Sequence, residues 1–187
     1  MKLTSEAALR DHYGHPHDMV RQKVLSALEV HSRQFLSLSP FMVMSTSNEE
    51  GQLDSSPRGG EPGFVKILDD TTLLIPDAKG NNRLDSLRNI VLNPSVGCLF
   101  LVPGIHETLR INGKAEIRID DASLAHFAHL KQTPMSVICV HIEEVFLHCA
   151  RSLTTAGLWD PAAQVERSVL PPLGKMIRDQ IEAKSAV

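Results

Sequence analysis

Strand-length stretches of apolar residues, separated by short polar turns, constrain the fold of this chain more than any other feature of its sequence. The expected strands cover residues 41–47, a run that begins at 52, and then 64–68, 72–75, 96–102, 107–119 and 136–149. The segment 107–119 alternates apolar with polar residues, as a strand with one buried face does. Six or seven strands with such short connections indicate a mainly β, antiparallel, Greek-key-like barrel. A Rossmann fold would need alternating strands and helices and a glycine-rich turn, and neither is present.

Helical spacing of apolar residues predicts a few helices that cover the barrel, which makes the fold class α+β. The first should begin with Asp18 as its N-cap and end before Pro40. The others are expected at 83–92, from Asp120 or Asp121 to about 131, and at 173–183. We expect one domain at 18–160, preceded by a polar arm at 1–17 and followed by a C-terminal extension at 161–187.

Charge and composition exclude several classes of partner. The formal net charge is −3, so the chain has no overall positive field for holding nucleic acid. No stretch of about 18 apolar residues could cross a membrane, and the first ten residues lack the apolar centre of a signal peptide. Cys98, Cys139 and Cys149 show no CxxC spacing, so reduced thiols are the simplest interpretation. We expect a cytoplasmic protein with no nucleic-acid or membrane partner.

A candidate anion site lies at 75–88, where an expected strand leads through a glycine-containing loop into a helix. The loop carries Lys79, and the helix is expected to open at Asn82 and Arg83. Helix N-termini present unpaired N–H groups and a partial positive charge, and two cations beside them suit a phosphate monoester. The alternative is that Asn82 only caps the helix while both cations are solvated.

Two further segments carry candidate binding residues. The loop 55–63 combines prolines, which stiffen it, with glycines, which let a flat ligand approach the main chain, and it offers Arg58 as another cation. The alternative is a wide turn between edge strands. Further on, Thr108, Arg110 and Asn112 share the polar face of one expected strand. Such a face usually meets solvent, so by itself it indicates little.

The order of these segments resembles the pyridoxamine 5′-phosphate oxidase-like family of FMN-binding split-barrel proteins, and is most similar to a bacterial subgroup of it. The resemblance covers roughly residues 35–160. Seven short blocks carry it, at 56–59 (Ser-Pro-Arg-Gly), 62–65 (Pro-Gly-Phe-Val), 74–77 (Leu-Ile-Pro-Asp), 83–89 (Arg-Leu-Asp-Ser-Leu-Arg-Asn), 107–113 (Glu-Thr-Leu-Arg-Ile-Asn-Gly), 146–149 (Phe-Leu-His-Cys) and 158–161 (Leu-Trp-Asp-Pro).

The resemblance implies a homodimer with FMN at the subunit interface. Its phosphate would lie on the loop from Lys79 to Arg83, with Arg58 near the phosphate or the ribityl chain. The backbone at Pro76 and Asp77 would face the flavin. Thr108 and Arg110 would lie beside the ring or the ribityl chain. Trp159 would approach the flavin edge from a C-terminal segment, that of its own chain or that of the partner subunit; its alternative role is a packing anchor.

The implied activity is that of an FMN-dependent oxidoreductase, whose substrate the sequence does not identify. The oxidase proper has a C-terminal Arg-x-His motif, and none follows Cys149 here. The subgroup usually has a basic stretch after this block, and here only Arg151 keeps a cation. A non-catalytic flavin carrier or sensor, a deazaflavin reductase, and a haem-binding relative using His106, His141 or His148 are the alternatives.

No metal site is expected. His12, His15 and His17 precede the fold and have no carboxylate cluster beside them. Four further candidates lie on one expected strand, where neighbours face opposite sides and cannot all bind one ion: Cys139, His141, His148 and Cys149. For dimerisation, an apolar barrel face that bears Val96, Leu99 and Leu101, or the face beside it, should be covered by the second subunit.

Overall fold

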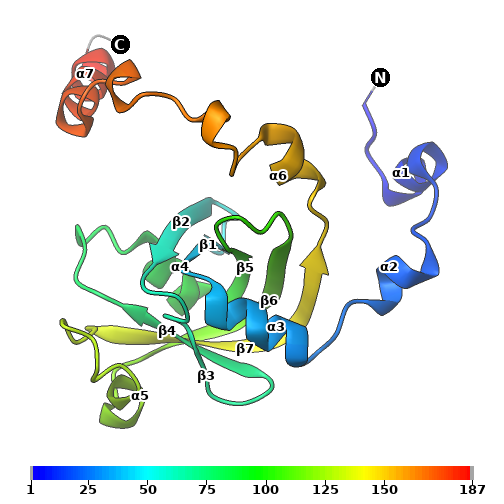
Figure 1. Cartoon of the computed structure of the whole chain (residues 1–187), viewed down its shortest axis with the longest axis horizontal. Coiled ribbons are helices and arrows are strands. Elements are labelled where there is room, and N and C mark those ends of the chain that lie inside the picture. The colour runs from blue at the N-terminus through cyan, green and yellow to red at the C-terminus, as the bar shows by residue number, and fades with distance from the viewer. Residues whose placement is uncertain (1, 186–187) are drawn as a thin grey trace.

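The computed structural model describes residues 2–185, and its centre is a seven-stranded antiparallel sheet that curls into an open, split barrel (Figure 1). The strands lie in the order β2-β1-β5-β6-β7-β4-β3. Their bounds are β1 Phe41–Ser47, β2 Leu53–Gly59, β3 Lys66–Ile67, β4 Thr72–Asp77, β5 Ser95–Leu101, β6 Thr108–Arg118 and β7 Ser136–His148. The predicted fold class is confirmed. Only the expected strand at 64–68 is markedly shorter, because just Lys66 and Ile67 pair with β4.

Seven α-helices and two short 3₁₀ turns accompany the sheet in the described residues. They are α1 Glu6–Tyr13, α2 Asp18–Gln22, α3 Val30–Leu38, α4 Asp85–Leu92, α5 Asp121–Ala125, α6 Arg151–Ala156, η1 Pro161–Ala163, η2 Arg167–Val169 and α7 Leu173–Ser185. Helices α3 and α4 pack on the barrel, whereas α1 and α7 lie away from it and bury none of their residues (Figure 1). None of the helices in 2–185 has the length and apolar character needed to cross a membrane.

The barrel core is built from alternate residues of the long strands. Met42 and Met44 of β1 and Phe100 of β5 are completely buried. Each such side chain contributes roughly 1.5–3 kcal/mol when it leaves water. The same alternation divides the apolar face expected on β5, because Val96 points into the core while Leu99 is only half-buried on the outer side. The predicted grouping of Val96 with Leu99 was therefore wrong.

A β-bulge adjusts the pairing of the two longest strands. Asn112 pairs with Glu144 but Gly113 pairs with Ile142, so Glu143 has no partner across the ladder. A Cβ atom on Gly113 would lie 2.0 Å from the carbonyl oxygen of His141, and only glycine allows so close an approach.

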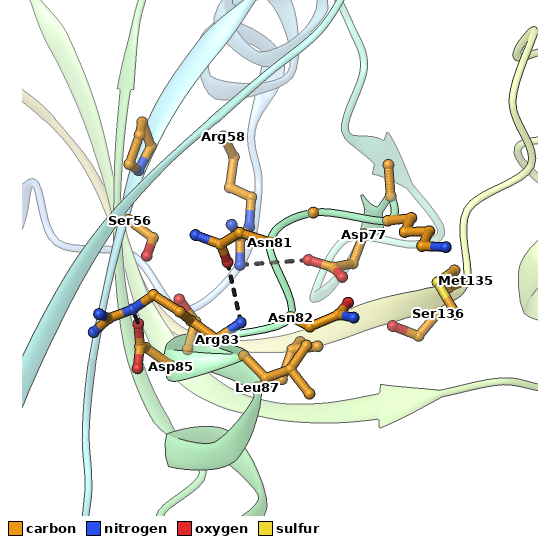
Figure 2. Close-up of a pocket in the computed structure, with 16 residues that line it drawn as sticks. Ser56, Arg58, Asp77, Asn81, Asn82, Arg83, Asp85, Leu87, Met135 and Ser136 are labelled. Atoms are coloured by element: carbon orange, nitrogen blue, oxygen red, sulfur yellow. Dashed lines mark hydrogen bonds and ion pairs between the residues drawn. The ribbon is translucent and has the colours of Figure 1, made fainter. Parts of the chain in front are cut away.

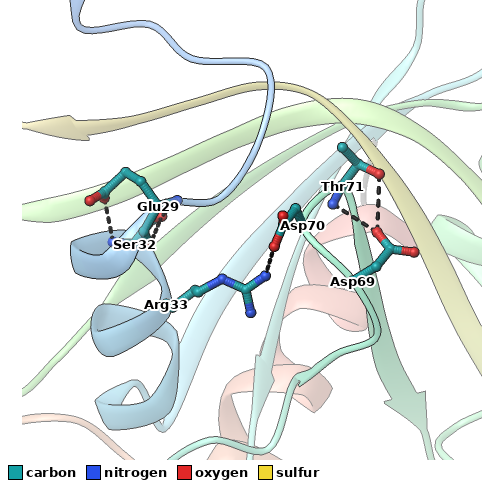
Figure 3. A network of polar contacts seen from close by, with 6 residues as sticks. All are labelled: Glu29, Ser32, Arg33, Asp69, Asp70 and Thr71. Atoms are coloured by element: carbon teal, nitrogen blue, oxygen red, sulfur yellow. Dashed lines mark hydrogen bonds and ion pairs between the residues drawn. The ribbon is translucent and has the colours of Figure 1, made fainter.

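The single helix expected between Asp18 and Pro40 is in fact two helices, so this prediction was wrong about the segment between them. Leu25 forms an isolated antiparallel bridge with Val145 of β7, with N–O distances of 3.0 and 2.8 Å. A new helix, α3, then begins after Glu29, whose carboxylate accepts hydrogen bonds from the N–H groups of His31 and Ser32. Figure 3 shows the contact with Ser32. Long-range pairing overrides helical periodicity here.

Helix α3 is fastened to the turn between β3 and β4. Arg33 forms an ion pair with Asp70 at the tip of that turn (Figure 3). Beside it, Asp69 accepts hydrogen bonds from the backbone N–H and the hydroxyl of Thr71, at 2.8 and 3.0 Å. The acidic turn seen in the sequence thus both closes a hairpin and holds a helix.

Helix α5 is shorter than expected. Of the two predicted caps, Asp120 is the one that caps it, by accepting the N–H of Ser123 at 2.9 Å. The helix ends at Ala125, and the chain continues to about residue 131 in tight turns. These turns bury Phe127 completely against Val137. The chain thus leaves the α-helical path just before Phe127 enters this small core.

Candidate functional site

A hollow of about 620 Å³ lies where β2, the end of β4, the loop 78–84 and the start of α4 meet (Figure 2). Three cationic side chains line it, from Arg58, Lys79 and Arg83. Two carboxylates, from Asp77 and Asp85, line it as well. We call this site the basic hollow. Its volume falls within the range of small-molecule and cofactor sites.

Strand alternation places the contribution of β2. Asp54, Ser56 and Arg58 are half-buried, whereas the residues between them are exposed. Arg58 pairs with Met42 and Ser56 pairs with Met44, two core residues of β1, so these polar side chains lie on the inward side of an edge strand. The segment expected as a glycine- and proline-rich loop is therefore mostly strand, which fixes the direction of Arg58.

One carboxylate ties α4 to β2. Asp54 Oδ2 accepts hydrogen bonds from the hydroxyl of Ser56 at 2.8 Å and from the hydroxyl of Ser86 at 2.7 Å. Ser86 is in the first turn of α4 and is almost completely buried. The start of the helix is consequently held against the strand that carries Arg58.

The N-terminus of α4 differs from the prediction. The helix begins at Asp85, not at Asn82 and Arg83, and its N-cap is Leu84, which makes no side-chain cap hydrogen bond. Asn82 and Leu84 both have left-handed backbone conformations, with φ of 60° and 59°. Such conformations cost of order 1–3 kcal/mol for residues other than glycine and often occur at binding sites. The first turn of α4 therefore presents backbone N–H groups that no capping side chain satisfies.

Arg83 lies at the mouth of the basic hollow. Its backbone N–H donates to Asn81 Oδ1 at 3.0 Å, and its Nε donates to Asp85 Oδ2 at 2.8 Å (Figure 2). The side chain is 73% exposed, so it can reorient towards a ligand. Hydrogen bonding to Asp85 raises the pKa of Arg83, which stays fully charged.

Arg58 and Asp77 form the inner wall. Arg58 Nη2 lies 3.5 Å from Asp77 Oδ1, and both side chains are at most one-fifth exposed. Burial raises the pKa of Asp77, an effect that the nearby Arg58 opposes. Arg58 Nε is buried and has no hydrogen-bond partner in the described residues. An orphaned donor of this kind is costly and is typical of a site that awaits an acceptor.

Thr108 and Arg110 lie elsewhere. They line a second hollow, of about 470 Å³, on the outer face of β1, β5 and β6, together with Ser45, Leu99 and His148. We call it the strand-face hollow. Arg110 lies over the ring of Phe146, with 5.1 Å from Cζ to the ring centroid. Within one chain, then, these two residues are not brought together with the basic hollow.

Trp159 lines neither hollow. Its indole N–H donates to the carbonyl oxygen of Ile105 at 2.9 Å, which fastens the C-terminal segment to the loop between β5 and β6. Within a single chain, this hydrogen bond is what holds Trp159 in place. Pro76 is at the end of β4, where it pairs with Val137 and directs the chain into the loop of the basic hollow.

Sequence reasoning missed several residues of the basic hollow. Met135 and Ser136 enter it because Ser136 pairs with Asp77, a register that only the folded sheet reveals. Asn81, Ser56 and Ser86 also line it. For Ser56 a signal was available in the sequence, because it lies in the block 56–59 and only two residues before Arg58.

Comparison with known proteins agrees with this architecture. The family described as pyridoxamine 5′-phosphate oxidase matches residues 28–149, which include all seven strands. No curated protein matches the chain.

Two solved structures illustrate the likeness. HupZ from Group A Streptococcus is 19% identical, with a TM-score of 0.52 over 64% of this chain and 94% of that one. A putative pyridoxamine 5′-phosphate oxidase from Lactobacillus delbrueckii is 20% identical, with a TM-score of 0.53 over 65% of this chain and 95% of that one. At such identities they show a shared fold only. Because the family match extends from α3 to the end of the sheet, the chain belongs to the pyridoxamine 5′-phosphate oxidase-like family.

Proposed function

We propose that this protein binds FMN and acts as an FMN-dependent oxidoreductase in a homodimer. The observation that carries the proposal is the basic hollow, where three cations surround a helix start whose backbone donors lack a side-chain cap. A phosphate monoester supplies the oxygens that such a site lacks.

The residues of the hollow fit the phosphate end of FMN. Lys79 lines the hollow and makes no ion pair within residues 2–185, while Arg83 is exposed enough to exchange Asp85 for a ligand oxygen. Asn82 lines the same wall in its left-handed conformation. The phosphate would be held by Lys79, Arg83 and the first N–H groups of α4.

The inner wall fits the ribityl chain or the ring. Arg58 Nε is a buried donor without an acceptor in the described part of the chain, and a ligand hydroxyl or carbonyl oxygen would provide one. The backbone at Pro76 and Asp77 borders the same space. Bound FMN supplies hydride and electron transfer. The protein would orient the cofactor, and Arg58 would place positive charge beside the ring, where reduced flavin gains negative charge.

A second copy of the chain would complete the site. Thr108 and Arg110 lie in the strand-face hollow, apart from the basic hollow of their own chain. Around them the outer sheet face carries apolar side chains, with Phe41 exposed and Val43, Leu99 and Leu101 half-buried. We propose that two chains pair through this face, so that each basic hollow receives Thr108 and Arg110 of the partner subunit. Trp159 would likewise reach the basic hollow of the other subunit.

The protein is proposed to act in the cytoplasm. Cys98, Cys139 and Cys149 are all free thiols, which supports a reducing compartment. For Cys98, complete burial raises the pKa to about 12, although Arg58 opposes the shift. This thiol is therefore inert at neutral pH.

The absorbance spectrum of the purified protein, followed by FMN titration and turnover assays with reduced nicotinamide cofactors, tests the proposal. Flavin absorption, tighter binding of FMN than of riboflavin and measurable turnover are expected. A Soret band would favour a haem protein instead, and preference for a deazaflavin would favour a deazaflavin reductase. FMN binding without turnover would leave a carrier or sensor.

A further inference from the structure

A cluster of three potential metal ligands lies on the outer surface of β6 and β7, outside both hollows. Glu116 of β6 is the direct cross-strand partner of Cys139 of β7, and His141 follows Cys139 by two residues on the same face. One ligand atom from each of the three residues lies within 4.8 Å of the other two. Their neighbourhood follows from strand pairing, so the folded sheet holds it in place.

We propose that Glu116, Cys139 and His141 bind a divalent zinc ion. His141 Nε2 lies 3.9 Å from Cys139 Sγ and 3.8 Å from Glu116 Oε1. In tetrahedral zinc sites the metal–ligand bonds of roughly 2.0–2.3 Å place ligand atoms about 3.4–3.6 Å apart. A side-chain rotation that moves His141 Nε2 by a few tenths of an ångström, and a somewhat larger movement of the flexible Glu116 carboxylate, would bring the three ligand atoms to these distances around one ion.

The surroundings are built for three ligands and an open fourth position. Cys139 is completely buried and rests on an apolar floor that includes Leu74, Phe127 and Val137. His141 and Glu116, by contrast, have side chains that are about half exposed, at 51% and 53%. The ion would enter from solvent and keep water as its fourth ligand, as zinc does where the protein provides three.

Charge balance is compatible with the ion. A thiolate and a carboxylate offset the two positive charges of zinc, so Arg118 would face a neutral complex. Arg118 Nε donates to Glu116 Oε1 at 2.7 Å, the oxygen that lies 3.8 Å from His141 Nε2. Arg118 thereby orients the carboxylate, and the second lone pair of this oxygen stays available to the metal. Carboxylate ligands are commonly supported by such outer hydrogen bonds. The nearest ammonium group on β6, that of Lys114, is engaged with Ser95 Oγ at 2.8 Å.

Binding requires a proton to leave. Burial raises the pKa of the Cys139 thiol, with Arg118 opposing and Glu116, Asp69 and Asp120 adding to the shift. The incoming ion forms a bond to sulfur as the S–H proton passes to water, and it takes His141 in its neutral form. Zinc affinity should therefore rise with pH, with about one proton released per ion bound near neutrality.

The test uses the full-length protein, metal-free at the start. Zinc is titrated against a chromophoric chelator, and Co²⁺ serves as a spectroscopic probe. We expect one equivalent of zinc to bind, and Co²⁺ to show sulfur-to-metal charge-transfer absorption. Cys139→Ser should abolish that absorption, and His141→Gln should weaken zinc binding at least tenfold. Since Cys139 is buried, His141→Gln on the exposed side keeps the test valid if Cys139→Ser misfolds.

Matched controls separate this site from other ligands. Cys149→Ser removes an exposed thiol, and His15→Ala removes an imidazole of the N-terminal arm; neither should change affinity. The proposal is overturned if Co²⁺ gives no thiolate absorption, or if that absorption depends on Cys149 instead of Cys139. Zinc binding that His141→Gln leaves intact but His15→Ala removes would overturn it equally.

Discussion

Arg58 and Asp77 form an ion pair, with 3.5 Å between Nη2 and Oδ1, although their strands are separated by four others in the sheet order. The pair exists because the sheet curls until its β2 edge approaches β4. Closure of the barrel and assembly of the basic hollow are thus the same structural event. The two residues also give the hollow one internal cation and one internal anion, whose effects on a bound flavin should be opposite.

Arg58→Gln should lower the two-electron reduction potential of bound FMN. A unit charge about 5 Å away at an effective dielectric of 20 contributes roughly 3 kcal/mol before screening. A third of that corresponds to about 20 mV for a two-electron couple. Redox titration with saturating FMN in both proteins measures the shift. An unchanged potential together with unchanged FMN affinity would exclude electrostatic contact between Arg58 and the flavin.

Asp77→Asn should move the same potential upward, since it removes a negative charge and leaves Arg58 uncompensated. The same redox titration measures the shift.

Asp77→Asn should also change the pH dependence of folding. The pKa of Asp77 is raised by burial in the folded state, so its carboxyl favours folding at low pH, and that contribution is lost as pH rises through the folded pKa, above its ordinary 3.8. Urea unfolding from pH 3.5 to 7 should show a weaker loss of stability across this window in the variant. Parallel curves would contradict the assignment.

Arg83→Ala should weaken FMN binding about tenfold while riboflavin binding changes little. A charge-assisted bond to phosphate is lost, but wild-type Arg83 must first leave Asp85, which offsets part of the gain. Fluorescence titration with both ligands measures the ratio. Arg88→Ala is the matched control, because Arg88 lies on the same helix, is exposed and does not line the hollow. Equal losses for FMN and riboflavin would place the phosphate elsewhere.

Much of the sheet could be predicted from sequence because strand burial repeats every two residues. The expected strand at 41–47 coincides with β1, and β5, β6 and β7 differ by one residue at their ends. The helix between Asp18 and Pro40 could not be predicted correctly, since its interruption depends on Leu25 meeting Val145, 120 residues later. Local periodicity carries no information about such a partner.

The part of the site that could be predicted from sequence is the part whose residues are neighbours along the chain. Lys79, Asn82 and Arg83 are close in sequence, and they line one hollow. Ser136 and Asp77 meet through strand register, which the pattern of a single strand does not reveal. The same holds for Glu116 and Cys139, whose neighbourhood needed the pairing of β6 with β7. The separation of Arg110 from Arg83 is likewise a property of the barrel, not of either segment.

Glu29→Ala should destabilise the fold by about 0.5–1 kcal/mol at neutral pH, because α3 loses its N-cap. Burial tends to raise the pKa of Glu29, but hydrogen bonds from His31 and Ser32 outweigh it and lower the pKa below 4.5. Its stabilisation is present above the unfolded pKa and disappears as pH falls through the folded one. Urea unfolding at pH 7 and pH 3 measures the difference, which should shrink in acid. Glu50→Ala, in an exposed turn, is the control.

Mixing two weakly binding variants should restore FMN binding if two chains share each site. Arg83→Ala damages the basic hollow, and Arg110→Ala damages the strand-face hollow. In a mixed dimer one site would carry both substitutions, while the other would combine an intact basic hollow with an intact Arg110 of the partner. Refolding the variants together should therefore restore wild-type affinity at one of the two sites in each mixed dimer. Sedimentation should give twice the 20.6 kDa chain mass. If Arg110 served the hollow of its own chain, every site would keep one lesion and no recovery would follow.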